Sequence, residues 1–367
     1  MPKTAPDDSL IAADAPLASL LAQLNDDARV AVDTEFLRES SYFPRLCLVQ
    51  LAGREALGLL DTLAGVELGP LHRFLAQRTR CKVLHAAHQD LEIFTHATQA
   101  VPGPIFDTQL AAGLLGYAPQ IGFGDLVREV LGVTLAKGHA RTDWTRRPLS
   151  AAQLEYARDD VRYLLPLADA LTERLESSGR AAWFAEDARG AEELARYVQD
   201  PATAWERLRW AHSLSGARLA ATQRIAAWRE ARALRLDRPR GWILSDAAIS
   251  ELVERMPKGT ADLERLRELP AALISKCGAE LLELIAAPGE PLAARPRATS
   301  RLDATQMTLV KKLGEELRRI AGQLGLSAEV LATQKELRAL VRGERDVSVL
   351  GGWRRAVAGD ALTALLA

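Results

Sequence analysis

Residues 29–35 read RVAVDTE, an apolar run that ends in two carboxylates, Asp33 and Glu35. An apolar run bounded by charge predicts a β-strand. Side chains alternate between the faces of a strand, so Asp33 and Glu35 project together from one face. Carboxylates this close repel one another unless a cation lies between them, and oxygen ligands of this kind select Mg²⁺ or Mn²⁺. Taken alone, such a pair is more often two solvated acids at a strand end.

Short apolar runs and helical patterns surround this strand, and their alternation predicts an α/β domain. The further predicted strands are 46–51, 57–61 and 81–84, and the predicted helices are 68–78, 88–98, 107–116, 123–131 and 151–177.

Strand signals almost vanish after about residue 186, where the chain becomes a series of amphipathic helices. Residues 287–300, APGEPLAARPRATS, have no periodicity and predict a linker. We therefore expect three domains, at residues 1–185, 200–287 and 301–367.

The composition describes a globular protein, with 48% hydrophobic and 26% charged residues among 367. Cys47, Cys81 and Cys277 are widely spaced and form no zinc-binding pattern, so a reducing cytoplasm fits best. The acidic N-terminus does not match a signal peptide. No run of about 18 apolar residues predicts a membrane span.

The net charge of −1 argues against a wholly basic nucleic-acid binder. Its distribution is uneven, because residues 1–185 carry 18 basic and 23 acidic residues and the remainder carries 29 and 25. Acids in one part and basic modules behind it suit an enzyme that acts on nucleic acid.

Two further motifs carry acids. In HAAHQDLE, residues 85–92, Asp90 lies in the first turn of a predicted helix, where an acid also favours the helix dipole. His85 and His88 lack a third soft ligand, which indicates a structural rather than a metal-binding role. Tyr156 and Asp160 are four residues apart on a later predicted helix and therefore share one face. Alone, such a pair is usually a structural hydrogen bond.

The stretch 137–149, KGHARTDWTRRPL, combines basic residues with an aromatic residue. Lys137, Arg141 and Arg147 are candidates for contact with phosphate, and Trp144 for stacking or packing. A solvated basic loop is the more common interpretation of such a stretch by itself.

Together the three acidic motifs resemble the DEDD exonucleases, in the subclass whose last motif is Tyr-x-x-x-Asp. The resemblance implies a ribonuclease H-like α/β exonuclease domain, a mixed central sheet flanked by helices. It also implies two Mg²⁺ or Mn²⁺ ions, held by Asp33, Glu35, Asp90 and Asp160, with Tyr156 orienting the attacking water.

The wider sequence is similar to bacterial ribonuclease D over nearly its whole length, notably in DTEFLRESSYFPRLCLVQLA (33–52) and KGHARTDWTRRPLSAAQLEYARDDVRYLLPL (137–167). Residues 200–287 resemble an HRDC domain, in which Arg229 and Arg240 are candidates for nucleic-acid contact. The tail is similar to a degenerate second HRDC repeat.

The likeness to ribonuclease D implies a cytoplasmic, monomeric 3′→5′ exoribonuclease. Such an enzyme releases nucleoside 5′-monophosphates from the 3′ ends of precursor tRNA and other small structured RNAs. Two alternatives stay open: a DNA 3′→5′ exonuclease on the same fold, and a catalytically silent RNA-binding module. Intact carboxylates argue against the silent module, since a silent site has no reason to keep mutually repelling acids.

Overall fold

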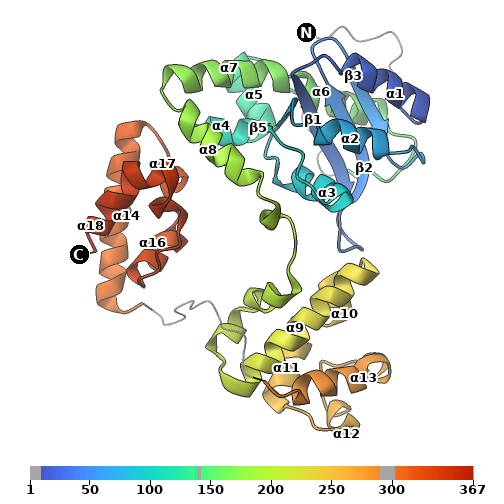
Figure 1. The fold of residues 1–367 in the computed structure, drawn as a ribbon, viewed down its shortest axis with the longest axis vertical. Coiled ribbons are helices and arrows are strands. Elements are labelled where there is room, and N and C mark those ends of the chain that lie inside the picture. The colour runs from blue at the N-terminus through green and yellow to red at the C-terminus, as the bar shows by residue number, and fades with distance from the viewer. Residues whose placement is uncertain (1–9, 137, 139–141, 290–301, 367) are drawn as a thin grey trace. The chain divides into compact units, whose positions relative to one another are not determined.

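A computed structural model describes residues 10–136, 138, 142–289 and 302–366 (Figure 1). The chain divides into two compact units. The first comprises Met1–Leu37, Leu46–Tyr197 and Leu302–Ala367, and the second comprises Arg38–Arg45 and Val198–Arg301. Most of the predicted linker at 287–300 lies outside the described residues.

A five-stranded mixed sheet forms the centre of the first unit, in the order β3-β2-β1-β4-β5. Strand β2 pairs antiparallel with β3, while β4 pairs parallel with both β1 and β5. The four predicted strands and the mixed sheet are confirmed. The fifth strand was missed because three residues give too short a signal. The strands are β1 (Arg29–Leu37), β2 (Arg45–Ala52), β3 (Leu57–Asp61), β4 (Cys81–Leu84) and β5 (Ile105–Asp107).

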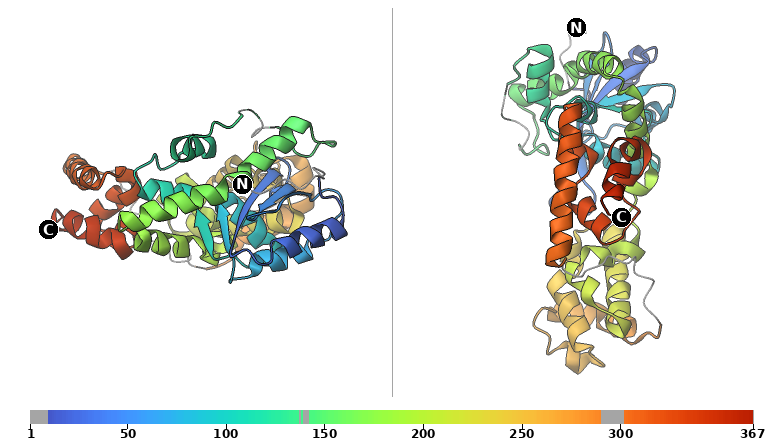
Figure 2. Two further views of the ribbon diagram at one scale, coloured as in Figure 1. Left: turned by 90° about the horizontal axis from the view of Figure 1, so that it is seen from above. Right: turned by 90° about the vertical axis from the view of Figure 1, so that its left-hand side faces the viewer.

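Helices cover both faces of the sheet (Figures 1 and 2). On one face, Val30 and Val32 of β1 share a core with α1 (Asp14–Gln23), α2 (Gly69–Ala76) and α3 (His88–Thr98). On the other face, Ala31 belongs to a core with α4 (Thr108–Leu114), α5 (Phe123–Leu131) and α7 (Leu164–Ser177). The alternation of β1 therefore assigns its odd-numbered side chains to one face and its even-numbered ones to the other.

The predicted helix at 151–177 is two helices, α6 (Ala151–Arg162) and α7. Pro166 has no N–H and is tolerated in a first turn, so α7 begins anew at Leu164. Ser150 caps α6 in a capping box with Gln153. In the described part of the chain, no helix is long and apolar enough to cross a membrane.

The C-terminal helices share a core with α4, α5 and α7 of the first unit. The Trp353 indole stacks on Trp183 of α8 (Ala181–Ala191), with ring centroids 4.3 Å apart and planes 6° apart. Arg354 donates to both oxygens of Asp187 at 2.5 and 2.9 Å. This segment contains α14 (Ala304–Leu324), α15 (Ala328–Leu331), α16 (Gln334–Val341), 3₁₀ turn Ser348–Leu350, α17 (Gly352–Arg354), π-helical turn Arg355–Gly359 and α18 (Asp360–Ala364).

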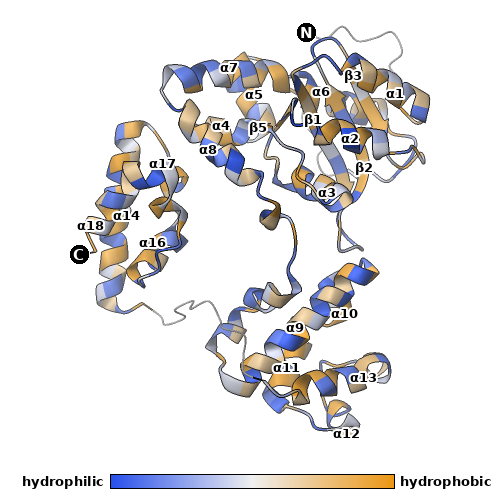
Figure 3. Ribbon diagram, viewed as in Figure 1, coloured by the Kyte–Doolittle hydropathy of each residue, from blue (hydrophilic) through white to orange (hydrophobic). Residues whose placement is uncertain are grey.

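Helices make up the second unit, whose long helices alternate hydrophobic and hydrophilic stretches in Figure 3. The hydrophobic core of this unit includes Trp205, Ile225, Leu252 and Leu281. After a 3₁₀ turn at Leu194–Arg196 in the first unit, the elements here are 3₁₀ turns Pro201–Arg207 and Arg209–Ser213, α9 (Gly216–Leu236), α10 (Arg240–Ile243), α11 (Asp246–Arg255), α12 (Thr260–Leu263) and α13 (Ala271–Ala286).

A buried carboxylate organises one end of this second unit. Glu230 of α9 is 0% exposed. It accepts a hydrogen bond from the Tyr42 hydroxyl and forms ion pairs with Arg207 at 3.1 Å and Arg240 at 3.7 Å. The Asp237 carboxylate accepts the N–H groups of Tyr42 and Phe43, each at 3.0 Å. The segment Arg38–Arg45, which follows β1 in the chain, is thus held within the helical unit.

Candidate active site

Strand β1 supplies the first two carboxylates. Asp33 and Glu35 share the face of Ala31, where α6 also packs against β1 and β3. The side chain between them, Thr34, is buried on the opposite face. The predicted projection of the two acids from one face is therefore present.

Helix α6 supplies Tyr156 and Asp160 one turn apart. The Tyr156 hydroxyl hydrogen-bonds to the Asp160 carboxylate. The neighbouring Asp159 accepts a hydrogen bond from Arg162 at 2.7 Å instead. The fully buried Oδ2 of Asp160 has no hydrogen-bond partner among the described protein atoms.

Asp90 lies in the first turn of α3 and is buried. The Thr34 hydroxyl donates to its Oδ1. The turn into α3 places Ala86 at φ 54° in the left-handed region, and the Asp107 carboxylate accepts the N–H groups of Ala86 and Ala87 at 3.0 Å. Asp107 thereby fixes the start of the helix that carries Asp90.

The carboxylates meet although they come from separate elements. One oxygen each of Asp33, Glu35 and Asp160 lies within 4.8 Å of the others. Asp90 is not part of that tight group, but its charge raises the pKa of both Asp33 and Glu35.

Burial and mutual repulsion shift these groups strongly. Burial first, and then the charges of Asp160 and Asp90, raise the pKa of Glu35 to about 9. The same causes raise the pKa of Asp33 well above its usual range. Burial raises the pKa of Asp90 and of Asp160 to about 7, against the opposing hydrogen bonds from Thr34 and Tyr156. Clustered acids with shifts this large are typical of functional sites.

The donor set fits a hard divalent cation. It offers only carboxylate oxygens, one of them the unpartnered Asp160 Oδ2, and neither Glu35 nor Asp160 has its pKa lowered by a described cationic side chain. His85 is excluded as a ligand, because its Nδ1 lies 2.9 Å from the Thr108 hydroxyl and its Nε2 lies 3.0 Å from the Ile121 carbonyl. The predicted structural role of His85 is confirmed.

Two supporting side chains escaped the sequence prediction. Gln50, fully buried on β2, directs its Nε2 to Asp33 Oδ2 at 3.5 Å. Thr34 holds Asp90. The sequence signal for each was a polar residue within an apolar strand. That signal does not indicate a role until the residue that the polar side chain contacts is known.

The basic stretch before α6 proves largely structural where it is described. Trp144 is 2% exposed and packs with Cys47 and Leu149, so it is a core residue rather than a stacking platform. Arg147 forms two hydrogen bonds of 2.6 Å to Asp61 and another to the Cys47 carbonyl at 2.9 Å. Lys137 and Arg141 lie outside the described residues.

The two arginines singled out in the HRDC-like region are also engaged inside the protein. Arg229 is 4% exposed and donates to the Leu244 carbonyl at 3.0 Å and to Asp246 at 2.6 Å. Arg240 pairs with Glu230 and lies 5.6 Å from the Tyr42 ring. These contacts bury the Arg229 guanidinium, whereas the Arg240 side chain is 40% exposed, and the contact of these arginines with nucleic acid stays a prediction.

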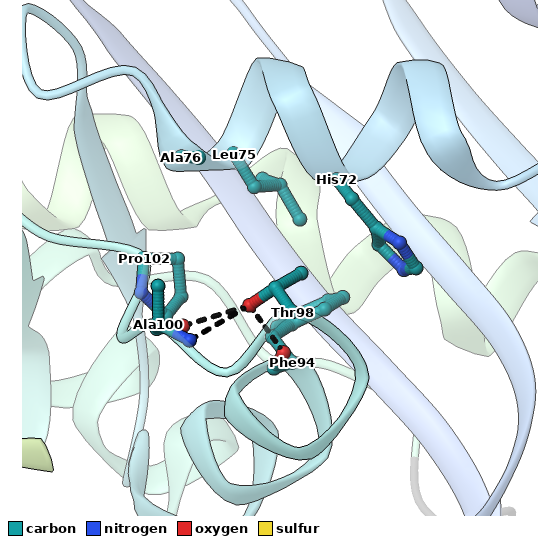
Figure 4. A pocket seen from close by; sticks show the side chains of 7 residues that line it. All are labelled: His72, Leu75, Ala76, Phe94, Thr98, Ala100 and Pro102. Atoms are coloured by element: carbon teal, nitrogen blue, oxygen red, sulfur yellow. Dashed lines mark hydrogen bonds between the residues drawn. The ribbon is translucent and has the colours of Figure 1, made fainter.

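A cavity between α2 and α3 is too small for a nucleotide. Its volume is about 10 Å³, comparable to one water molecule, and the buried His72 Nε2 on its wall has no hydrogen-bond partner among the residues that the structure describes (Figure 4). It therefore does not compete with the carboxylate cluster as an active site.

Comparisons with known proteins identify the family to which the chain is similar. A family model described as 3'-5' exonuclease matches residues 10–176, and an HRDC domain model matches residues 218–285. Ribonuclease D of Granulibacter bethesdensis is 37% identical, covering 98% of this chain and 93% of its own. Ribonuclease D of Pseudomonas paraeruginosa is 36% identical, covering 98% and 97%. The crystal structure of Escherichia coli RNase D, "an exoribonuclease involved in structured RNA processing", aligns with a TM-score of 0.85, 30% identity and 98% coverage of both chains.

Proposed function

The chain belongs to the ribonuclease D family of 3′→5′ exoribonucleases, and we propose that it trims the 3′ ends of precursor tRNA and other small structured RNAs, releasing nucleoside 5′-monophosphates. The observation that carries the proposal is the convergence of Asp33, Glu35 and Asp160 within 4.8 Å, in a chain similar to ribonuclease D from end to end.

We propose Asp33, Glu35, Asp90 and Asp160 as metal ligands and Tyr156 as the residue that orients the attacking water. The unpartnered Asp160 oxygen and the raised carboxyl pKa values support this assignment. Two Mg²⁺ or Mn²⁺ ions held there would activate the water and stabilise the leaving oxygen.

The protein's own side chains have distinct tasks in this reaction. The water oxygen gives up a proton to solvent and forms a bond to phosphorus, while the bond from phosphorus to the 3′ oxygen breaks and that oxygen takes up a proton from solvent. Tyr156 keeps its proton, because burial and the charges of Asp160, Glu35 and Asp33 raise its pKa, and so it acts as a hydrogen-bond donor. Thr34 and Gln50 hold the two acids that they contact.

The proposed organisation is an exonuclease domain at 1–185, an HRDC domain at 200–287 and a second, degenerate HRDC-like domain at 301–367. We keep Lys137 and Arg141, which lie outside the described residues, among the proposed nucleic-acid contacts. We propose a monomer that works in the cytoplasm, which the three free cysteines support.

The two alternative functions are less well supported. A DNA exonuclease on the same fold would not account for full-length likeness to ribonuclease D, including the helical region. A silent RNA-binding module would not account for the buried acids, whose repulsion disfavours the folded state unless they bind a cation.

The test offers 3′-extended tRNA and single-stranded DNA of equal length, with Mg²⁺, with Mn²⁺ or with excess chelator, and identifies the products. We expect metal-dependent release of nucleoside 5′-monophosphates from the RNA, and almost none from an Asp33→Asn variant. Equal or faster digestion of the DNA would contradict the proposed substrate, and undiminished cleavage in chelator would exclude the metal site.

A further inference from the structure

The most exposed large hydrophobic side chain in the described chain is Trp242, in the helical unit. Trp242 is 62% exposed, whereas the two residues that follow it, Ile243 and Leu244, are buried. The turn of α10 is fixed by hydrogen bonds from Trp242 N–H to the Pro239 carbonyl at 2.9 Å and from Leu244 N–H to the Arg240 carbonyl at 3.0 Å. The backbone that carries Trp242 is thus held by hydrogen bonds, while the indole is exposed to solvent.

A pocket of about 320 Å³ opens beside this tryptophan, within the range of small-molecule sites. Residues of α10 and of the start of α13 line the pocket. Pro270 and Leu273 are apolar lining residues, and Lys276 adds a positive charge. One acid, Glu268, also lines the pocket. All of these residues lie within the second unit.

Two cations at the site are not used elsewhere in the described structure. The Arg238 guanidinium lies 5.9 Å from the centroid of the Trp242 ring, at a cation–π distance, and forms no ion pair there. Lys276 is exposed and likewise has no ion-pair partner among the described residues. By contrast, Arg232 of the same region pairs with Glu280. An exposed aromatic ring with two free cations beside it is complementary to a base and its phosphate.

We propose that Trp242, Arg238 and Lys276 form a binding site for one unpaired nucleotide of the RNA substrate, with the base stacked on the indole and the phosphate held by the two cations. The inference rests on the proposed function and assigns this contact to residues other than Arg229 and Arg240. Stacking on an indole is tolerant of base identity, so the site adds affinity without sequence preference.

The first test measures the affinity of the full-length protein for a single-stranded RNA in chelator, where cleavage is absent. We expect Trp242→Ala to weaken binding roughly 5- to 50-fold, and Trp242→Phe to restore most of it, because a phenyl ring still stacks. The matched control is Leu236→Ala, which removes another exposed apolar side chain that does not line the pocket. Unchanged affinity in Trp242→Ala, or an equal loss in Leu236→Ala, would overturn the proposal.

Salt dependence separates the two kinds of contact. Arg238→Gln and Lys276→Gln should each reduce the slope of log affinity against log salt, by roughly 0.7 in total when combined, the value for one phosphate contact on a single strand. Trp242→Ala should leave that slope unchanged, because stacking releases no counterion. If neither cation variant changes the salt slope, the proposed site does not bind a phosphate.

A crosslink locates the base directly. RNA carrying 5-iodouridine should attach on irradiation to tryptic peptide 241–255, GWILSDAAISELVER, whose one aromatic residue is Trp242. A crosslink there in the wild type that is lost in Trp242→Ala supports the site, and its absence from that peptide contradicts it. Cleavage of a dinucleotide with Mg²⁺ is measured in parallel. If the wild type cleaves but does not crosslink, only the stacking proposal fails, and if it crosslinks but cleaves no RNA, only the proposed function fails.

Discussion

At the scale of single residues, one substitution tests the role of the Tyr156 hydroxyl in the active site. Phenylalanine keeps the ring and removes only the hydrogen bond to Asp160. If Tyr156 orients the attacking water, Tyr156→Phe should lower kcat by roughly 10- to 10³-fold with little change in KM. Steady-state kinetics on a short RNA, with the folded fraction measured by thermal unfolding, provides the readout.

A purely structural tyrosine gives a different result. Tyr197 donates its hydroxyl to the Ala191 carbonyl at 2.6 Å, so Tyr197→Phe should cost about 1–3 kcal/mol of stability and leave turnover per folded molecule unchanged. If Tyr156→Phe behaves in the same way, Tyr156 is not a catalytic residue.

The raised pKa values of the carboxylates predict how stability varies with pH. Asp90 and Asp160 have a pKa of about 7 and Glu35 of about 9, above the values near ~4 of an unfolded chain. A carboxyl whose folded pKa is raised favours the folded state below its unfolded pKa and loses that contribution as pH rises toward the folded pKa. Between about pH 4 and 9, these acids should therefore increasingly destabilise the metal-free protein.

Asp33→Asn isolates this effect. In chelator, its Tm should exceed that of the wild type by a margin that grows from pH 5 to pH 9. Mg²⁺ should then stabilise the wild type more as pH rises, because binding displaces protons, and stabilise the variant little. The control is Asp346→Asn, an exposed acid outside the cluster. A margin that stays constant with pH would contradict the coupled cluster.

At the scale of elements, the loop that leads into α6 depends on Arg147. Burial of Asp61 raises its pKa, but the hydrogen bonds from Arg147 and the Leu63 N–H, together with the charge of Arg147, bring it below its usual value. Lysine cannot form the paired contact to Asp61 and also reach the Cys47 carbonyl. Arg147→Lys should cost about 1–3 kcal/mol of unfolding free energy while the salt slope of RNA binding stays unchanged.

Arg146→Lys is the matched control in the same loop, since its side chain is 84% exposed and its one ion pair with a described residue is to Asp143 at 3.2 Å. Urea denaturation of the two variants measures the contrast. A reduced salt slope in Arg147→Lys, at unchanged stability, would restore the predicted phosphate contact.

At the scale of the whole molecule, the C-terminal helices act as part of the exonuclease unit. Leu313 and Leu317 of α14 share a buried core with Leu167 and Leu171 of α7. A variant ending at residue 301 should therefore melt at a lower temperature and expose apolar surface, seen as increased binding of a hydrophobic dye. If it melts like the full chain and cleaves a dinucleotide at the same rate, the segment is dispensable to that unit.

The sequence alone determined the features that depend on local periodicity. The alternation in β1 put Asp33 and Glu35 on one face, and the spacing of four residues put Tyr156 above Asp160. These relations hold in any fold that keeps the element, since they follow from backbone geometry. The family resemblance rests on the same short motifs and on their order along the chain.

Only the tertiary structure decided which elements approach one another. The distance of 4.8 Å that gathers Asp160 with the two acids of β1 depends on how α6 packs against the sheet, as do the raised pKa values. Packing also buried Trp144 and Arg229, two residues whose chemistry equally suits contact with RNA, while leaving Trp242 exposed. Residue type permits either role, and burial selects between them because a side chain enclosed by its own core cannot reach a ligand.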